Sequence, residues 1–138
     1  MKQSVSKARI TVLRLVFALV GFGQIAIFWP KLLNHSSDWA LKFGNEVAMI
    51  SGMAVLMVIG IRFPLRMLPI LVFEFVWKCL WLIAIYSPLA REGRVDGPTH
   101  ESLVNVGVGA VVCGLAIPWG YVWRTYLKPL GNLTSPEV

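Results

Sequence analysis

Residues 65–86 read LRMLPILVFEFVWKCLWLIAIY, a run of 22 residues that is apolar apart from Arg66 near its start and Glu74 and Lys78 near its middle. The hydrocarbon layer of a bilayer is about 30 Å thick, and a helix needs about 20 mostly apolar residues to cross it. Because the run is continuous and lacks the alternation of polar and apolar residues typical of a barrel strand, it predicts a membrane-spanning helix.

Three further apolar runs lie elsewhere in this chain of 138 residues, which is 57% hydrophobic and only 14% charged. Soluble domains are about 45–50% apolar and about 25% charged, and disordered chains are poor in apolar residues, so both classes are excluded. The sequence therefore predicts an all-α integral membrane four-helix bundle that forms a single transmembrane domain over residues 1–138. The predicted spans are residues 10–29, 46–61, 65–86 and 103–121.

Prolines are expected to mark the ends of the spans. Trp29-Pro30 should end the first helix and Ser87-Pro88 the third, because proline cannot continue a hydrogen-bonded helical turn. Arg62-Phe63-Pro64 predicts a very short turn that makes the second and third spans antiparallel neighbours, with Pro64 in the opening turn of the third. Pro118 should bend the fourth span near its end.

Two segments outside the spans have weaker patterns. Residues 34–43 combine good helix caps with aromatic side chains, and they predict a short helix on the membrane surface. Residues 129–138 are rich in Gly, Pro, Ser and Asn, so a poorly ordered tail is expected. The first span should be retained, since its apolar run is too long for a signal peptide and no cleavage site follows it.

The net charge of +6 is distributed between the apolar runs. This placement is typical of a membrane protein and excludes a nucleic-acid partner, because nucleic-acid binders gather their basic residues on one face of a soluble domain. Seven basic residues would lie on the side of the termini and four on the other, which predicts that both termini are cytoplasmic. The seven are Lys2, Lys7, Arg9, Arg62, Arg66, Arg124 and Lys128, and the four are Lys31, Lys42, Arg91 and Arg94.

Glu74 and Lys78 are the most informative polar residues in the chain. They are four positions apart in the third span, so they project from one face of the helix. A charge near the centre of a membrane costs about 2.5–3.5 kcal/mol on insertion scales, so such residues need partners or a function. Two interpretations stay open: a mutually neutralising pair that fixes helix packing, or a proton relay, ion site or polar ligand pocket.

Two polar residues of the first span could join this pair as a ligand-binding or structural group. Arg14 lies near the cytoplasmic start of the span, where it can extend to the headgroups or turn inward toward Glu74. Gln24 lies at a depth similar to that of Lys78, and an amide between membrane helices usually strengthens packing. Asn105 in the fourth span is interpreted in the same way.

Small residues spaced by four predict close contacts between helices, namely Ala48 with Gly52 and Ala110 with Gly114. Cys79 and Cys113 lie within apolar helix interiors and are expected to be small buried side chains. His35 and His100 are isolated. No cysteine or histidine spacing indicates a metal or cofactor site, and no catalytic constellation is present, so neither cofactor nor enzyme activity is expected.

The first half of the chain resembles the DoxX-like family of small four-helix bacterial membrane proteins. The residues that carry the likeness, within 10–66, are Arg14, Gly21, Gly23, Pro30-Lys31-Leu32, Glu46 and Gly60-Ile61-Arg62. The stretches 61–81 and 117–124 also look like those of an uncharacterised bacterial membrane protein family. The DoxX-like resemblance implies a subunit of a quinone-linked oxidoreductase, or a membrane partner of redox or detoxification enzymes. This chain departs from it in having no redox-active cysteine pair and no cofactor ligands.

Together these patterns predict a multi-pass protein of the bacterial inner membrane that has no catalytic activity of its own. It would be an accessory or interaction component, or would bind a small amphipathic ligand within the bundle. Its partners would be the lipid bilayer and either a second copy or another membrane protein. Two alternatives stay open: a transporter of protons or small solutes acting as an oligomer, and a membrane subunit of a quinone-linked oxidoreductase complex.

Overall fold

The computed structural model describes residues 5–34 and 41–129, and in these ranges the chain is helical and contains no strand. Four helices are long and apolar enough to cross a membrane, which confirms the predicted all-α fold and makes the chain a multi-pass membrane protein. The elements are α1 Lys7–Leu33, α2 Leu41–Arg62, α3 Leu68–Trp81, a π-helical segment Leu82–Tyr86, α4 Ser87–Arg91, α5 Gly97–Ala116, α6 Trp119–Val122 and a second π-helical segment Trp123–Leu127.

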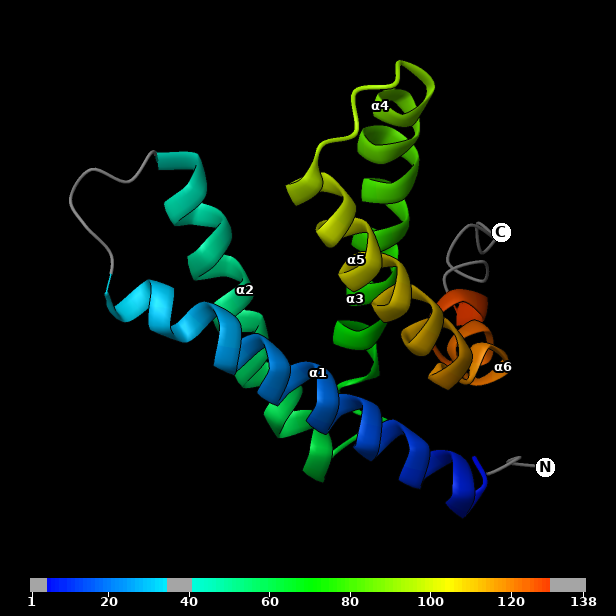
Figure 1. Ribbon diagram of the computed structural model, residues 1–138. Coiled ribbons are helices and arrows are strands. Elements are labelled where there is room, and N and C mark those ends of the chain that lie inside the picture. The colour runs from blue at the N-terminus through cyan, green and yellow to red at the C-terminus, as the bar shows by residue number, and fades with distance from the viewer. Residues whose placement is uncertain (1–4, 35–40, 130–138) are drawn as a thin grey trace, which may run out of the picture.

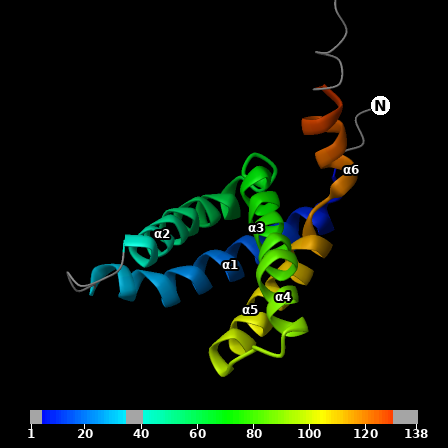
Figure 2. The ribbon, with the colours of Figure 1, turned by 90° about the horizontal axis from the view of Figure 1, so that it is seen from above.

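The long helices form two antiparallel pairs (Figure 1). Helix α1 packs along α2, and α5 packs along α3. From the turn at residues 63–67, α2 and α3 run in opposite directions as predicted, but they diverge, as the view from above also shows (Figure 2). The shared core lies where the pairs meet, and among its members are Leu13, Phe17, Met57, Leu71 and Cys113.

Three predicted helix boundaries at prolines are wrong. Pro30 lies inside α1, which continues to Leu33. Proline removes only its own N–H bond, and the carbonyl of Pro30 still accepts from the backbone N–H of Asn34 at 3.0 Å, so the last turn stays closed. After the turn between α2 and α3, α3 begins at Leu68 and not at residue 65. Pro69, and not Pro64, therefore lies in its opening turn.

Ser87-Pro88 does not end the third span either, because the helix continues through the π-helical segment into α4 and ends at Arg91. The backbone N–H of Ser87 bonds to the carbonyl of Leu82, five residues back. This wider turn changes which carbonyl faces the ring of Pro88, so the proline is accommodated within the span. Pro118 was expected to bend a fourth span that continues to residue 121, but α5 ends at Ala116 and Ile117 is extended, so the proline follows the end of the span.

The second and fourth spans begin earlier in the chain than predicted. Helix α2 begins at Leu41, so the end of the predicted surface helix over 34–43 belongs to a span, and its residues 35–40 lie outside the described ranges. Helix α5 begins at Gly97, where the Asp96 carboxylate accepts from the backbone N–H of Thr99 at 2.8 Å. Hydrogen bonds from the Thr99 side chain and backbone lower the pKa of Asp96. The predicted tail lies beyond the described ranges except for Pro129.

In the second span, the small residue at the close helix contact is not one of the predicted pair, Ala48 and Gly52. Ala48 is exposed, and a side chain at Gly52 would meet nothing within 4 Å. Gly60 instead lies against the ring of the fully buried Phe17 of α1. The reason is rotation: Gly60 shares a helix face with the core residue Met57, whereas Gly52 lies on the opposite side.

We expect Gly60→Ala to lower the free energy of unfolding by about 1–2 kcal/mol, because the new Cβ would overlap the Phe17 ring by more than the helix gains in propensity. Gly52→Ala on the same helix is the matched control and should be neutral or stabilising by about 0.4–1 kcal/mol. Denaturant unfolding in detergent micelles measures both. Equal effects of the two substitutions would contradict the close contact at Gly60.

Candidate functional site

The centre of the candidate site is the carboxylate of Glu74, on the inward face of α3. This side chain is 0% exposed. Its Oε1 pairs with the Nζ of Lys78 and accepts from the Nε2 of Gln24 on α1 at 2.8 Å. Its Oε2 accepts from the indole N–H of Trp77 at 2.8 Å. Both oxygens therefore have donors, as a buried charge requires.

Lys78 lies one turn beyond Glu74 and is 7% exposed. Its Nζ is 4.3 Å from the centroid of the Trp77 ring, where a cation is attracted to the aromatic face. Its stem crosses α5 at Gly109, where an added Cβ would lie 2.5 Å from the Lys78 Cε. Gly109 thus leaves the space in which the lysine reaches the carboxylate.

The structure brings together three of the four predicted site residues: Glu74, Lys78 and Gln24. It does not bring in Arg14, which is exposed on α1 and makes no ion pair within the described ranges. Gln24 shares its helix face with the core residue Phe17, and Arg14 lies about 100° around the helix from the buried Leu13. Of the two open orientations, the outward one is therefore observed.

Trp77 is the site residue that the sequence reasoning missed. It follows Glu74 by three positions, a spacing at which side chains on one helix meet. That spacing was the available signal, and it is weak because the span also holds Trp81 and three phenylalanine or tyrosine side chains. Asn105, in contrast, is exposed.

Two buried polar atoms near the junction of α1 and α2 have no hydrogen-bond partner among the described residues. They are the Oε1 of Gln24 and the Oγ of Ser51. Gln24 thus uses its amide nitrogen toward Glu74 and leaves its oxygen unsatisfied. An unpaired buried acceptor costs about 1–3 kcal/mol, so this amide orientation is set by the carboxylate.

A groove of about 250 Å³ lies beside this network, between α2 and α3. Its walls include Met49 and Met53 from α2 and Phe73, Trp77 and Trp81 from α3, and the exposed Glu46 also lines it. Trp77 belongs to both features, since its ring lines the groove while its N–H holds Glu74.

Within residues 5–34 and 41–129, no group of three or more His, Cys, Asp or Glu side chains could hold a metal ion. Cys113 is fully buried in the core, as predicted, and Cys79 is partly buried. A scan against family models gave no match, and searches of curated proteins and of solved structures gave none either.

Proposed function

We propose that this multi-pass membrane protein is a non-catalytic component that binds a small amphipathic ligand in the groove between α2 and α3. The observation that carries the proposal is the double role of Trp77, which joins the groove wall to the buried Glu74 network. A ligand in the groove would contact the Trp77 ring, whose position is fixed by its hydrogen bond to Glu74. Preorganised walls of this kind lower the ordering cost of binding.

The lining of the groove supports an amphipathic ligand of small size. Met49, Met53 and the aromatic side chains provide a polarizable apolar wall, and thioethers adapt to irregular shapes. Glu46 supplies a carboxylate that would favour a polar or cationic end group. Small-molecule sites usually measure about 300–1,000 Å³, so a groove of about 250 Å³ suits a compact ligand.

The Glu74 network supports binding over the transport alternative. A carboxylate that carries protons needs access to both sides of the membrane, whereas Glu74 has no exposed surface and accepts three donors. We therefore assign the network a supporting role behind the groove. The quinone-linked alternative rests on the family resemblance alone.

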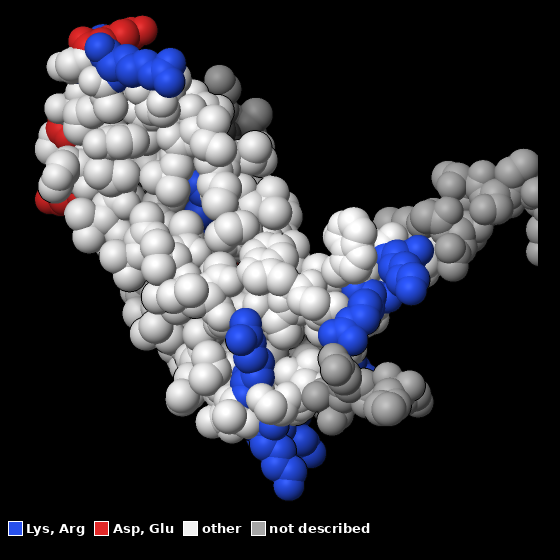
Figure 3. Space-filling model, turned by 90° about the vertical axis from the view of Figure 1, so that its right-hand side faces the viewer, with Lys and Arg blue, Asp and Glu red and all other residues white. Residues whose placement is uncertain are grey.

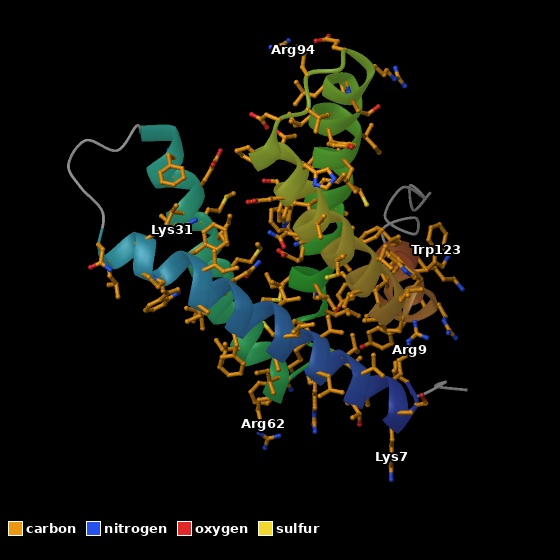
Figure 4. The ribbon with its side chains drawn as sticks, in the orientation of Figure 1. Lys7, Arg9, Lys31, Arg62, Arg94 and Trp123 are labelled. Carbon is orange, nitrogen blue, oxygen red and sulfur yellow. The ribbon has the colours of Figure 1, made fainter. Side chains whose placement is uncertain are left out.

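We further propose the bacterial inner membrane as the location, with both termini cytoplasmic. Lys7, Arg9 and Arg62 lie toward one end of the bundle and Arg94 toward the other (Figure 4). On the face shown in Figure 3, the acidic side chains lie near the end opposite to most basic ones. The excess of basic residues at the end of the termini supports this orientation.

Met49→Trp tests the proposed groove. Met49 is 61% exposed and lines the groove, so a tryptophan there should fill it without entering the core. We expect small molecules extracted with organic solvent from the protein purified in uncharged detergent to include a species that the variant loses. Mass spectrometry of the extracts measures this.

The matched control is Leu80→Trp, at a position of α3 that is 60% exposed and does not line the groove. It should keep the species at wild-type level. Wild-type protein that carries only bulk phospholipid, or equal losses in the two variants, would contradict the proposed function.

A further inference from the structure

A second hollow lies at the other end of the bundle from the loop between α4 and α5. It measures about 430 Å³ and is formed where the start of α1 meets the chain after the Pro118 break. It is lined by Arg9 of α1 and by Ser6, the residue that caps the start of α1. The other side is lined by Trp119 and Tyr121 of α6 and by Arg124 of the following segment. Figure 1 shows the start of α1 close to α6, and Figure 4 places Arg9 in this region.

Two arginines and no carboxylate line this hollow in the described part of the chain. The described acidic residues are Glu46, Glu74, Glu92, Asp96 and Glu101, and none of them belongs to its walls. The hollow is therefore positively charged, and the start of α1, a helix of 27 residues, adds the positive end of its dipole.

Arg9 is held in place by the end of α5. Its Nη2 donates to the carbonyls of Leu115 at 3.0 Å and Ile117 at 2.9 Å, beside the break at Pro118, and the Ile117 carbonyl also accepts from the backbone N–H of Trp119. These bonds occupy two of the five guanidinium N–H groups. Among the described residues the other three have no acceptor, so the group is fixed in orientation and able to bind an anion.

Arg124 and the aromatic side chains set the charge and depth of the hollow. The Nε of Arg124 donates to the carbonyl of Gly120 at 2.9 Å, which holds its guanidinium at the wall. The indole N–H of Trp119 donates to the carbonyl of Gly114 at 2.8 Å, at the end of a span. Tryptophan and tyrosine concentrate at headgroup depth, so the hollow would face the phosphate layer.

We propose that this hollow binds a phosphate group, which Arg9 and Arg124 contact through charge-assisted hydrogen bonds. The planar guanidinium suits two phosphate oxygens at once. Basic pockets beside membrane helices take anionic headgroups, and a free phosphate ion presents the same chemistry. The site is independent of the groove between α2 and α3.

The test uses the full chain in uncharged detergent. Native mass spectrometry with added phosphatidylglycerol or phosphatidylcholine measures headgroup binding, and calorimetric titration with sodium phosphate against sodium chloride at equal ionic strength measures free phosphate. Arg124→Gln and Arg9→Gln are the variants. Arg62→Gln is the matched control, an exposed arginine outside the hollow.

We expect phosphatidylglycerol to bind in preference to phosphatidylcholine, and each hollow variant to weaken binding about fivefold while Arg62→Gln does not. If phosphate binds and its affinity falls in the Arg9 and Arg124 variants, the free ion is a ligand of the hollow. If the phosphate titration gives no heat while phosphatidylglycerol binds, the lipid headgroup is the ligand. Arg124→Gln keeps the test valid should Arg9→Gln unfold, since the bond from the Nε of Arg124 to the Gly120 carbonyl lies within one helical turn. Equal weakening by Arg62→Gln, or no binding in either arm, overturns the proposal.

Discussion

Replacing Glu74 with methionine is expected to lower the free energy of unfolding by about 3–5 kcal/mol, the usual cost of removing one partner of a buried ion pair. The substitution leaves the ammonium of Lys78, which is 7% exposed, without its carboxylate. It also removes the acceptor of the Gln24 amide and the Trp77 indole. Unfolding in mixed micelles, followed by circular dichroism, measures the loss.

The double variant Glu74→Met with Lys78→Met distinguishes the pair from its surroundings. Apolar residues of similar volume often replace a buried ion pair without loss of stability, so the double variant should be more stable than Glu74→Met alone. It should stay below wild type, because the Gln24 amide and the Trp77 indole still lack their acceptor. Its expression should be intact, while ligand content in the groove should fall because Trp77 loses its anchor. A double variant as unstable as the single one, or with unchanged ligand content, would contradict these roles.

The four spans could be predicted from composition, because crossing a membrane requires length and apolarity, and both are visible in a sequence. Their ends could not be predicted at the same accuracy. Pro30 and Pro88 were expected to end helices, yet the first lies in a turn closed by Asn34 and the second follows a π-helical turn. Proline lacks a backbone N–H donor, and its ring clashes with a carbonyl of the preceding helical turn. Whether the helix continues in spite of this depends on local geometry and on neighbouring residues in space, which a sequence does not give.

The candidate site was predictable to the extent that it lies on one helix. The spacing of Glu74 and Lys78 places them together, and the depth of Gln24 matches that of Lys78. The depth of a residue in the membrane does not say which way its side chain points around the helix axis, so the sequence leaves two orientations open for Arg14. The structure shows the inward face of α1, because Leu13 and Phe17 are buried on it. Gly109 had no visible role, because its importance comes from the lysine of another helix.

Trp77→Phe is expected to lower the free energy of unfolding by about 1.5–3 kcal/mol, the value of a hydrogen bond to a charged group. Phenylalanine keeps a ring in the groove wall but cannot donate to the Oε2 of Glu74. Trp81→Phe controls for the loss of indole volume, since Trp81 lines the same groove. Equal destabilisation by both would mean that packing, and not the bond to Glu74, explains the effect.

Gln24→Met provides the contrasting case and completes this prediction. This substitution removes the Nε2 group of Gln24, which donates to the Oε1 of Glu74. At the same time it removes the unsatisfied oxygen of Gln24 itself. The lost bond is worth about 1.5–3 kcal/mol and the relieved acceptor about 1–3 kcal/mol, so the two terms nearly cancel. Unfolding of the variants under one condition should therefore rank Gln24→Met well above Trp77→Phe in stability. The reverse order would show that the oxygen of Gln24 has a partner in the membrane, and the groove-side bond would then be the weaker support of the carboxylate.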